Sequence, residues 1–523
     1  MPIRIKKDSE ADQSPQRRIS RSQAGRTQSA GGSGLLGALL PMVFRLFKTK
    51  PKLAIGLILV AVAAYFFMTR GVSDNSANNN SALKALLFGT GLEMDEKIYD
   101  EAEVFEPLAD NVKNPLPEQV SLEEYCPLRQ NQGEQGSCVG WSSAYAARTI
   151  MHARATGEDP DDVAFSPAYL YNQIALPNCQ GTYLQKAMEV MNNGGVLPFS
   201  RFGYNENSCA KKPTRSELQA ASAFRIKGFN RLSKGGNDYT TDILAIKQNL
   251  AQGAPVVIGM MVGGSFMSGM NGKKVWEPTR SDYSMKGFGG HALCLIGYDD
   301  YYQGGAFQIM NSWGEKWGDN GLFWIRYNDF EYFTREAYGL YPMGDADAPT
   351  TDELRVEIGL TANATGKNIP LQYTSGILFT TVHPMLSNTE FKIEIRNSLA
   401  CFTYIFGAET DGSSYVLFPY TKKHSPYCGI TGTRLFPKDY SLYPDESGEK
   451  DFMAIVISRQ KLDYNKLNDA IQQADGSTFE EKIYNTLESE MANDVQFLKG
   501  NRVEFMTNSP GKNTVAVVIG IEK

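Results

Sequence analysis

Strict alternation of apolar and polar residues marks the last third of the chain and predicts half-buried strands. Residues 354–358 (LRVEI) and 391–395 (FKIEI) show it most clearly, because successive side chains of a strand point to opposite faces. Runs at 401–406 and 415–418 flank residues 409–412 (ETDG), a turn sequence that predicts a β-hairpin. The remaining elements expected here are strands at 451–458 and 514–521 and amphipathic helices near 463–474 and 479–492. Residues 350–523 are therefore predicted to form a mostly β domain.

Helical periodicity dominates the middle of the chain. Apolar residues recur at helical spacing over residues 139–151, and Gly157 is expected to end that helix. The Ser-Pro pair at 166–167 predicts the start of a second helix, and residues 183–192 predict a third. Later apolar runs of strand length lie at 254–261, 292–298 and 306–310. Residues 116–345 are thus predicted to form a helical half and a β-rich half with a cleft between them.

The N-terminal segment combines a basic tail with an uncharged apolar run. Residues 1–52 are rich in Arg, Lys, Ser and Gln, a composition typical of disorder. Residues 53–68 (LAIGLILVAVAAYFFM) carry no charge and would span roughly 25 Å as a helix, the short end for a membrane span. We predict a single transmembrane anchor at 53–69, with a signal peptide or a buried core helix as alternatives. A second run at 35–47 is broken by Pro41 and is expected to be interfacial.

The charge distribution predicts the orientation of this anchor. The basic excess lies on its N-terminal side, so the N-terminal tail is expected in the cytoplasm. The domains that follow would then lie in the periplasm or outside the cell, and the membrane is an expected partner through the N-terminal helix. Residues 70–115 are Asn- and Ser-rich at first and then acidic, and they are predicted to be a linker.

Length and charge narrow the function classes. The chain has 523 residues, 42% of them hydrophobic, which is enough for two or three domains with sizeable cores. Its formal net charge of −6 gives no indication of nucleic-acid binding. No cofactor and no metal are expected, and His383 and His424 are interpreted as surface residues rather than ligands. The sequence does not indicate an oligomeric state.

Three segments far apart in the chain supply the parts of a thiol-based catalytic site. Cys138 begins the first predicted helix, where N–H groups and the helix dipole favour a thiolate. His291 would take the thiol proton and return it to a leaving amine, and Asn311 would orient the imidazole. Gln132, together with the Cys138 N–H, would stabilise the oxyanion. Trp313 would shield the His–Asn hydrogen bond and belongs with the predicted substrate-binding residues.

Each of these residues has an ordinary structural interpretation when taken alone. A buried cysteine usually packs as a small hydrophobe, and a single histidine is usually structural. The complete set in this order favours catalysis, so we predict a peptidase acting on peptides or proteins. The alternatives are a binding or scaffolding protein with little turnover, and a Cys/His enzyme that hydrolyses or transfers cell-wall peptides.

Residues 132–141, 290–298 and 311–321 resemble the three signature blocks of the papain-like cysteine peptidases. The third block (NSWGEKWGDNG) is the most specific, and the sequence around the cysteine resembles the bacterial branch of the family. The resemblance covers residues 116–345. It implies an α+β fold of two subdomains, one helical and one β-barrel-like.

The resemblance also implies roles for individual residues. Cys138 would be the nucleophile, His291 the general base and acid, Asn311 the orienting residue and Gln132 the oxyanion donor. The segment CQGTY at 179–183 resembles the family's substrate-binding glycine strand. It therefore implies a substrate-binding role for Gly181, for which a simple turn is the alternative.

The chain departs from the family pattern in several ways. Gln135 and Val139 stand where the family usually has a cysteine and a tryptophan. Family members usually carry a long inhibitory propeptide, whereas only a short segment here separates the apolar run from the domain. We therefore expect latency to come from elsewhere, for which the C-terminal domain is a candidate. Residues 402–419 and 448–457 of that domain resemble a bacterial domain of unknown function.

The chain has 7 cysteines, which suggests disulfides if the protein is exported as predicted. The family resemblance implies a bond between Cys179 and Cys209. Cys401 and Cys428 flank the predicted hairpin and are a second, hypothetical pair. Cys294 falls in an apolar run and is interpreted as a core residue.

Overall fold

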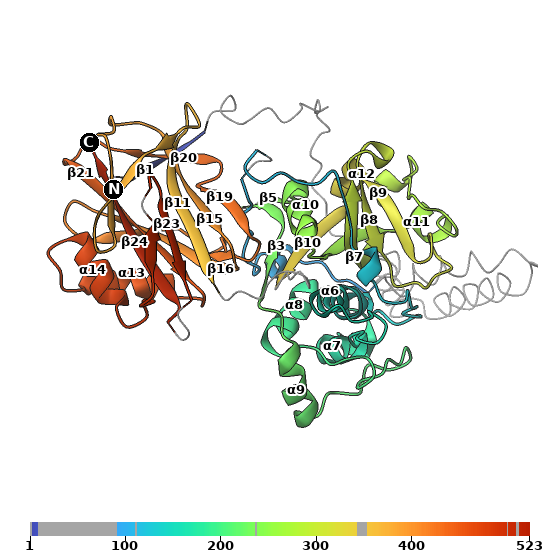
Figure 1. Cartoon of the computed structure of the whole chain (residues 1–523). Helices are drawn as coiled ribbons and strands as arrows, with labels where there is room; N and C mark the ends of the chain where they lie inside the picture. Colours follow the sequence, from blue (N-terminus) through green and yellow to red (C-terminus); the bar gives the residue numbers. More distant parts are fainter. Residues whose placement is uncertain are drawn as a thin grey trace, which may run out of the picture.

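The computed structural model shows two domains packed against each other (Figure 1). The structure describes residues 3–8, 91–109, 112–235, 238–341, 353–498, 500–508 and 512–523. Residues 112–341 make up the first domain and residues 353–523 make up most of the C-terminal domain. Helices and strands occur in both, so the fold is α+β with a β-rich C-terminal region.

The first half of the first domain is helical, as its periodicity predicts. A continuous helix runs from α5 (Cys138–Gly140) through the π-helical segment η2 (Trp141–Arg148) into α6 (Thr149–Thr156). Gly157 ends it in the left-handed conformation, with φ 72°. The predicted cap of α7 (Pro167–Ile174) is confirmed, because the Ser166 side chain accepts from the Tyr169 N–H. The helices α8 (Leu184–Asn193) and α9 (Arg215–Ala221) complete this half.

The second half of the first domain is an antiparallel sheet of seven strands in the order β3-β10-β6-β7-β8-β9, with β2 paired to β7. Its strands are β2 (Gln119–Ser121), β3 (Gly228–Arg231), β6 (Val256–Val262), β7 (Gly289–Asp299), β8 (Ala306–Met310), β9 (Leu322–Arg326) and β10 (Thr334–Tyr341). A hairpin of β4 (Ser233–Gly235) and β5 (Asp238–Thr241) and the helices α10 (Ile243–Ala251), α11 (Gly264–Ser268) and α12 (Tyr327–Phe333) connect them. Among the described residues the outer strands β3 and β9 do not pair. The half expected to be barrel-like is therefore an open sheet.

Both halves share one apolar core, which holds the helix beginning at Cys138 against the sheet. Val139 and Ile150 of the helix belong to the same buried cluster as Ile258 of β6 and Leu293 of β7. Burial of such side chains contributes about 1.5–3 kcal/mol each. The start of the helix is thereby held beside the middle of the sheet.

The C-terminal domain is a β-sandwich. One sheet has the order β1-β20-β15-β11-β23-β22 with β12 and β19 added, and the other has β13-β14-β24-β21-β16-β17 with β18 added. The strands of the first sheet are β1 (Ile3–Lys7), β11 (Leu354–Ala362), β12 (Asn368–Ile369), β15 (Phe391–Asn397), β19 (Gly432–Phe436), β20 (Tyr440–Pro444), β22 (Gln496–Leu498) and β23 (Val503–Thr507). Those of the second are β13 (Leu371–Ser375), β14 (Leu378–Thr381), β16 (Cys401–Ala408), β17 (Ser414–Phe418), β18 (Tyr427–Cys428), β21 (Lys450–Ser458) and β24 (Thr514–Glu522).

Two apolar clusters explain the layers of this domain. The larger joins Val356 and Ile393 of the first sheet to Ile455 and Val517 of the second, so it fills the space between the sheets. The smaller lies on the other face of the second sheet, under the helices α13 (Tyr464–Gln473) and α14 (Phe479–Leu487). All strands predicted here are confirmed, including the hairpin of β16 and β17. Helix α14 ends earlier than predicted, at Leu487.

The hypothetical disulfide between Cys401 and Cys428 is not formed. The two residues lie opposite each other in β16 and β18, but both are free thiols. Both are buried, and Thr403 Oγ1 lies 3.4 Å from Cys428 Sγ. Cys294 is fully buried in β7, which confirms its interpretation as a core residue.

The linker prediction for residues 70–115 is wrong for residues 91–109, which we call the strap. The strap contains the short helix α4 (Glu96–Tyr99) and is packed onto the first domain. Leu92, Tyr99, Phe105 and Leu108 of the strap are each 5% exposed or less. These widely spaced apolar side chains hold the segment in place despite its acidic composition.

The prediction that residues 1–52 are disordered is wrong for the first described residues. Strand β1 pairs antiparallel with β20, with Ile3 opposite Pro444 and Lys7 opposite Tyr440. Ile3 is 1% exposed. Asp8, which follows the strand, forms an ion pair with Lys392 at 2.6 Å in which both side chains are under a tenth exposed. These contacts attach the strand to the C-terminal domain.

The predicted membrane anchor at 53–69 and the apolar run at 35–47 lie outside the described residues. Within the described ranges, no helix combines the length and the apolar character needed to cross a bilayer.

Candidate active site

Cys138 is the first residue of α5, as predicted, and its side chain is fully buried. The Ala292 N–H donates to its Sγ at 3.5 Å. Burial raises the pKa of the Cys138 thiol to about 12, while the N–H groups of Ala292, Val139 and Cys138 itself lower it. Burial of the sulfur therefore opposes formation of the thiolate, and these N–H groups favour it.

His291 lies on β7, one residue before the amide that contacts the sulfur. Its Nε2 is 2.8 Å from Asn311 Oδ1, and both side chains are buried. Asn311 Oδ1 also accepts from the Ser312 N–H at 2.8 Å, which fixes the orientation of the amide. Asn311 must therefore accept from Nε2–H of the ring. The lone pair of the neutral imidazole is then on Nδ1, the nitrogen available to take a thiol proton.

Trp313 covers the imidazole. The two rings are stacked, with centroids 4.5 Å apart and an interplanar angle of 29°. Trp313 also packs edge-on against Phe266 and Trp317, at 5.6 Å and 5.4 Å. This aromatic cluster keeps water from the His291–Asn311 hydrogen bond and so strengthens it.

Gln132 is buried on the loop before Cys138. Its Oε1 accepts from Ser312 Oγ at 2.6 Å, and its Nε2 donates to the Gln135 carbonyl at 2.9 Å. An amide nitrogen carries two hydrogens, so one N–H remains to be donated to an oxyanion. Tyr204 Oη fixes the same loop, donating to the Gln132 carbonyl at 2.7 Å and lying 2.6 Å from Ser137 Oγ.

Sequence reasoning missed Ser312 and Tyr204 as positioning residues. Ser312 lies inside the Asn-Ser-Trp-Gly block, and its place in that motif could have indicated a positioning role. Tyr204 is far from any motif, and no local pattern marks it.

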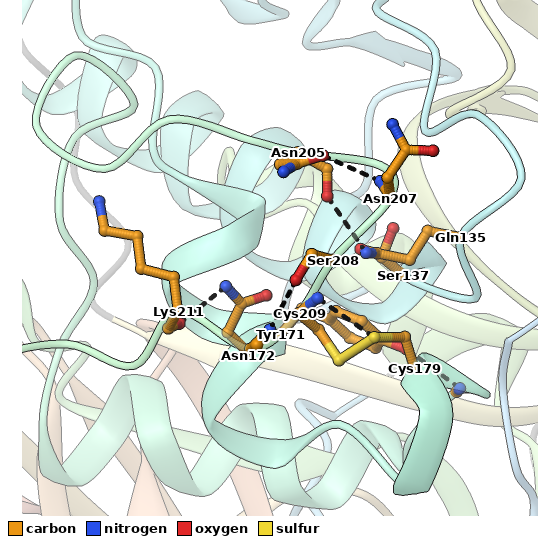
Figure 2. The surroundings of a disulfide bond; sticks show 12 residues. Gln135, Ser137, Tyr171, Asn172, Cys179, Asn205, Asn207, Ser208, Cys209 and Lys211 are labelled. Carbon is orange, nitrogen blue, oxygen red and sulfur yellow. Dashed lines mark hydrogen bonds between the residues drawn. A yellow bond between two sulfur atoms is a disulfide. The ribbon is translucent and has the colours of Figure 1, made fainter.

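Gly181 lies at the wall of the helical half, next to a disulfide. The Cys179–Cys209 bond implied by the resemblance is confirmed, and Figure 2 shows it beside the loop that carries Gln135 and Ser137. Gln135, which stands where the family has a cysteine, donates instead from Nε2 to the Asn205 carbonyl at 3.2 Å. Gly181 has φ 109°, and its N–H donates to Tyr171 Oη at 3.1 Å.

The N-terminal end of the strap crosses the space between the two halves. On the helical side, Thr182 N–H donates to the Gly91 carbonyl at 3.1 Å and Glu93 N–H donates to the Thr182 carbonyl at 3.0 Å. On the sheet side, Leu92 N–H donates to the Gly290 carbonyl at 3.2 Å. The strap therefore bridges the residues next to Gly181 and the residue before His291.

The close approach of the strap depends on glycines at both walls. A Cβ on Gly181 would lie 2.7 Å from the Gly91 carbonyl oxygen, and one on Gly290 would lie 2.4 Å from that of Leu92. A Cβ on Gly91 would lie 2.5 Å from the backbone of Gly136. Any larger residue at these positions would displace the strap.

Leu92 and Met94 of the strap pack over the backbone of Gly259 in β6, beside Glu336, and we call this packing position the Gly259 pocket. An ideal Cβ on Gly259 would meet Leu92 Cδ2 at 2.8 Å, Met94 Cε at 3.3 Å and Glu336 Cβ at 3.3 Å. Glu336 is 5% exposed, and its backbone pairs with Gly259 in the β10–β6 ladder. Burial raises the pKa of its carboxyl to about 8, with Asp95 adding to the effect.

The histidines of the C-terminal domain show no ligand geometry. His383 is exposed, and His424 Nδ1 lies 3.0 Å from Thr421 Oγ1. Among the described residues no group of three or more His, Cys, Asp or Glu side chains could hold a metal ion.

Comparison with known proteins finds similarity over the first domain. The sequence model of the Papain family cysteine protease matches residues 116–343. The chain is 30% identical over 213 residues to the uncharacterized peptidase C1-like protein L477 of Acanthamoeba polyphaga mimivirus. That alignment covers 38% of this chain and 63% of the viral protein, so the chain spans less than two thirds of that relative.

Two further proteins are similar to part of this chain. The cathepsin B-like CP2 of Giardia intestinalis is 26% identical over 230 residues, covering 40% of this chain and 69% of that protein. The crystal structure of xylellain, a cysteine protease from Xylella fastidiosa, aligns with a TM-score of 0.39 and 22% identity. It covers 48% of this chain and 94% of xylellain.

Proposed function

We propose that residues 116–343, which match the sequence model of the Papain family cysteine protease, form a cysteine protease domain, and that the protein hydrolyses peptide bonds with Cys138 as nucleophile. His291 Nδ1 takes the thiol proton, and the sulfur attacks the carbonyl carbon while the carbonyl π electrons move to oxygen. Gln132 Nε2 and the Cys138 N–H bind this oxyanion. The imidazolium then protonates the amine as the C–N bond breaks, which leaves an acyl-thioester.

Hydrolysis of the thioester returns the site to its starting state. The same imidazole takes a proton from water, and the hydroxide oxygen attacks the acyl carbon. The C–S bond breaks, and the proton returns to the sulfur. Asn311 holds the ring throughout, and Trp313 keeps water from the ring–amide hydrogen bond. Gly181 and the Gly259 pocket lie where a bound peptide would run, so we assign them to substrate binding.

One observation carries the proposal. The 2.8 Å contact between His291 Nε2 and Asn311 Oδ1 leaves Nδ1 as the basic nitrogen, and the next residue on the strand donates its N–H to Cys138 Sγ. A histidine kept only for packing would not need a buried amide to select its tautomer. The arrangement therefore supports turnover rather than a binding or scaffolding role.

The test is cleavage of a fluorogenic peptide library. Because Leu92 lies across the cleft, the full chain and Leu92→Asp are assayed side by side, each with and without Cys138→Ala. We expect cleavage that every Cys138→Ala version lacks, with unchanged thermal unfolding. Absence of cleavage in both forms that retain Cys138 would refute a peptidase function.

We further propose that residues 53–69 anchor the chain in a membrane, with the protease domain periplasmic or extracellular. The uncharged run and its basic N-terminal flank support this. The pairing of β1 with β20 argues against a single membrane crossing, because one crossing would put residues 3–7 and 440–444 on opposite sides of the membrane. Protease protection of tags at both termini in intact cells decides: tags on opposite sides support one crossing, and tags on the same side overturn it.

A further inference from the structure

We propose that the C-terminal domain is an inhibitory clamp that holds the strap across the active-site cleft and keeps the enzyme latent. The inference rests on the proposed peptidase function, since it names how that site is closed. Its premise is that residues 91–94 occupy the place of a substrate. They bridge Thr182 and Gly290 by backbone hydrogen bonds and fill the Gly259 pocket with Leu92 and Met94.

The strap lies in the cleft without being presented for cleavage. The Gly91 carbonyl oxygen is bound by the Thr182 N–H at 3.1 Å. It is therefore directed at the wall of the helical half, and not at Gln132 Nε2 or the Cys138 N–H. A peptide carbonyl that is not polarised by the oxyanion donors is a poor electrophile. The full burial of the Cys138 side chain is consistent with the same closed state.

Farther along, the strap lies between the two domains. Val104 forms isolated parallel β-bridges with Arg231 of the first domain and with His424 of the C-terminal domain. Its N–H donates to the Lys423 carbonyl at 2.6 Å, and its carbonyl accepts from the Ser425 N–H at 2.9 Å. Val104 thus connects the two domains through its backbone.

Ion pairs add to this attachment. Lys423 pairs with Asp100, which also accepts from the buried Arg231 at 2.9 Å. Lys461 pairs with Glu103 at 2.7 Å. Beyond them, the Ala109 N–H donates to the Thr433 carbonyl at 2.8 Å and Arg434 Nε to the Glu106 carbonyl at 3.1 Å. Every few residues from 100 to 109, the strap is held by the C-terminal domain.

Helix α4 connects the clamped part of the strap to the part in the cleft. Tyr99 at its end is 2% exposed, and its Oη exchanges hydrogen bonds with the backbone of Ala337 on β10, at 3.1 and 3.3 Å. Ala337 follows Glu336, whose side chain lines the Gly259 pocket. Holding residues 100–109 therefore keeps residues 91–94 at high effective concentration over the cleft. Loosening the clamp should raise the fraction of molecules with an open cleft.

The test measures the access of a small reagent to Cys138, which does not depend on peptide cleavage. The full chain is treated with iodoacetamide, and alkylation of the Cys138 peptide is followed by mass spectrometry. We expect Leu92→Asp, which puts a charge at a side-chain position that is 5% exposed, to react at least about tenfold faster than the wild type. The double variant Lys423→Met/Lys461→Met should react about threefold faster, in keeping with two partly exposed ion pairs.

A matched control and a second readout secure the result. Lys450→Met removes an ion pair with Glu522 in the same domain, away from the strap, and should alkylate at the wild-type rate. Hydrogen exchange should show lost protection at the Leu92 and Glu93 amides in both test variants, with β7 protected throughout. This excludes general unfolding as the cause.

The outcomes separate the two proposals. Wild-type alkylation rates in Leu92→Asp would overturn cleft closure by the strap. Faster alkylation in Leu92→Asp but not in Lys423→Met/Lys461→Met would overturn the clamp. Faster alkylation in both, with no peptide cleaved by any variant, would support the clamp and refute only the peptidase function.

Discussion

Replacing Asn311 by alanine is the sharpest test of the catalytic geometry. The change removes the acceptor 2.8 Å from His291 Nε2 and leaves Trp313 and the sheet in place. The ring is then free to turn and to take the other tautomer, in which Nδ1 carries the proton and cannot act as a base. The variant is made in the Leu92→Asp background, so that closure by the strap does not limit the measured rate.

The size of the effect follows from burial and charge. When the ring becomes imidazolium, its hydrogen bond to Asn311 is charge-assisted, and such bonds contribute about 1.5–3 kcal/mol. At about 1.4 kcal/mol per factor of ten, kcat/KM should fall roughly 10- to 150-fold. Asn311 also accepts from the buried Ser312 N–H, so the variant should lose about 1–3 kcal/mol of unfolding free energy.

The assay is the pH profile of kcat/KM with a fluorogenic peptide. The acid limb of the profile reports loss of the imidazolium proton, because the ring must be neutral to take the thiol proton. Removing the acceptor destabilises the imidazolium, so the acid limb should move to lower pH in Asn311→Ala. Asn311→Asp keeps an acceptor and serves as the matched control, with its acid limb at or above the original pH. Unchanged kcat/KM and an unchanged acid limb in Asn311→Ala would show that this residue does not orient His291.

Three further predictions concern stability. Burial raises the pKa of Glu336 from 4.5 to about 8, so its contribution is complete below about pH 4.5 and is lost as the pH rises to about 8. In urea unfolding, the free energy of unfolding of Glu336→Gln should rise relative to that of the wild type by up to about 4 kcal/mol across that pH window. A difference between the two proteins that does not change with pH would contradict a raised pKa of the buried carboxyl. Replacing Cys179 and Cys209 by serine opens a loop of 30 residues and should lower the free energy of unfolding by about 3–4 kcal/mol in the same assay. A reduced wild type that is as stable as the oxidised protein would contradict this prediction. Lys392→Met leaves Asp8 buried without its cation and should cost roughly 3–5 kcal/mol, with loss of hydrogen-exchange protection in β1; retained protection would show that the strand does not depend on this ion pair.

Several features could be predicted because their signals are local. The helix starting at Cys138, its end at Gly157 and the cap at Ser166 depend on residues within one or two turns. The alternating strands of the C-terminal domain could be predicted for the same reason, because the apolar and polar faces of a strand follow from the alternation of its own residues. The end of α14 was missed, since periodicity continues past Leu487 after the helix has stopped.

Other features depend on partners that are distant in the chain. The strap looked like an acidic linker, because its apolar anchors are widely spaced and their partners lie more than a hundred residues away. Nothing near Leu92 indicates that its amide meets Gly290. Strand β1 was hidden in a basic tail, and its pairing with β20 joins opposite ends of the sequence.

The sequence by itself predicted the candidate catalytic residues, many of the helices and strands and the division into two domains. Cys138, His291, Asn311 and Gln132 stand in motifs whose order implies their roles. Only the tertiary structure decided what covers the cleft, which nitrogen of His291 faces Asn311 and what the C-terminal domain touches. The physical reason is that periodicity and capping are set by near neighbours, whereas the closing of a site is set by contacts between segments that meet only after folding.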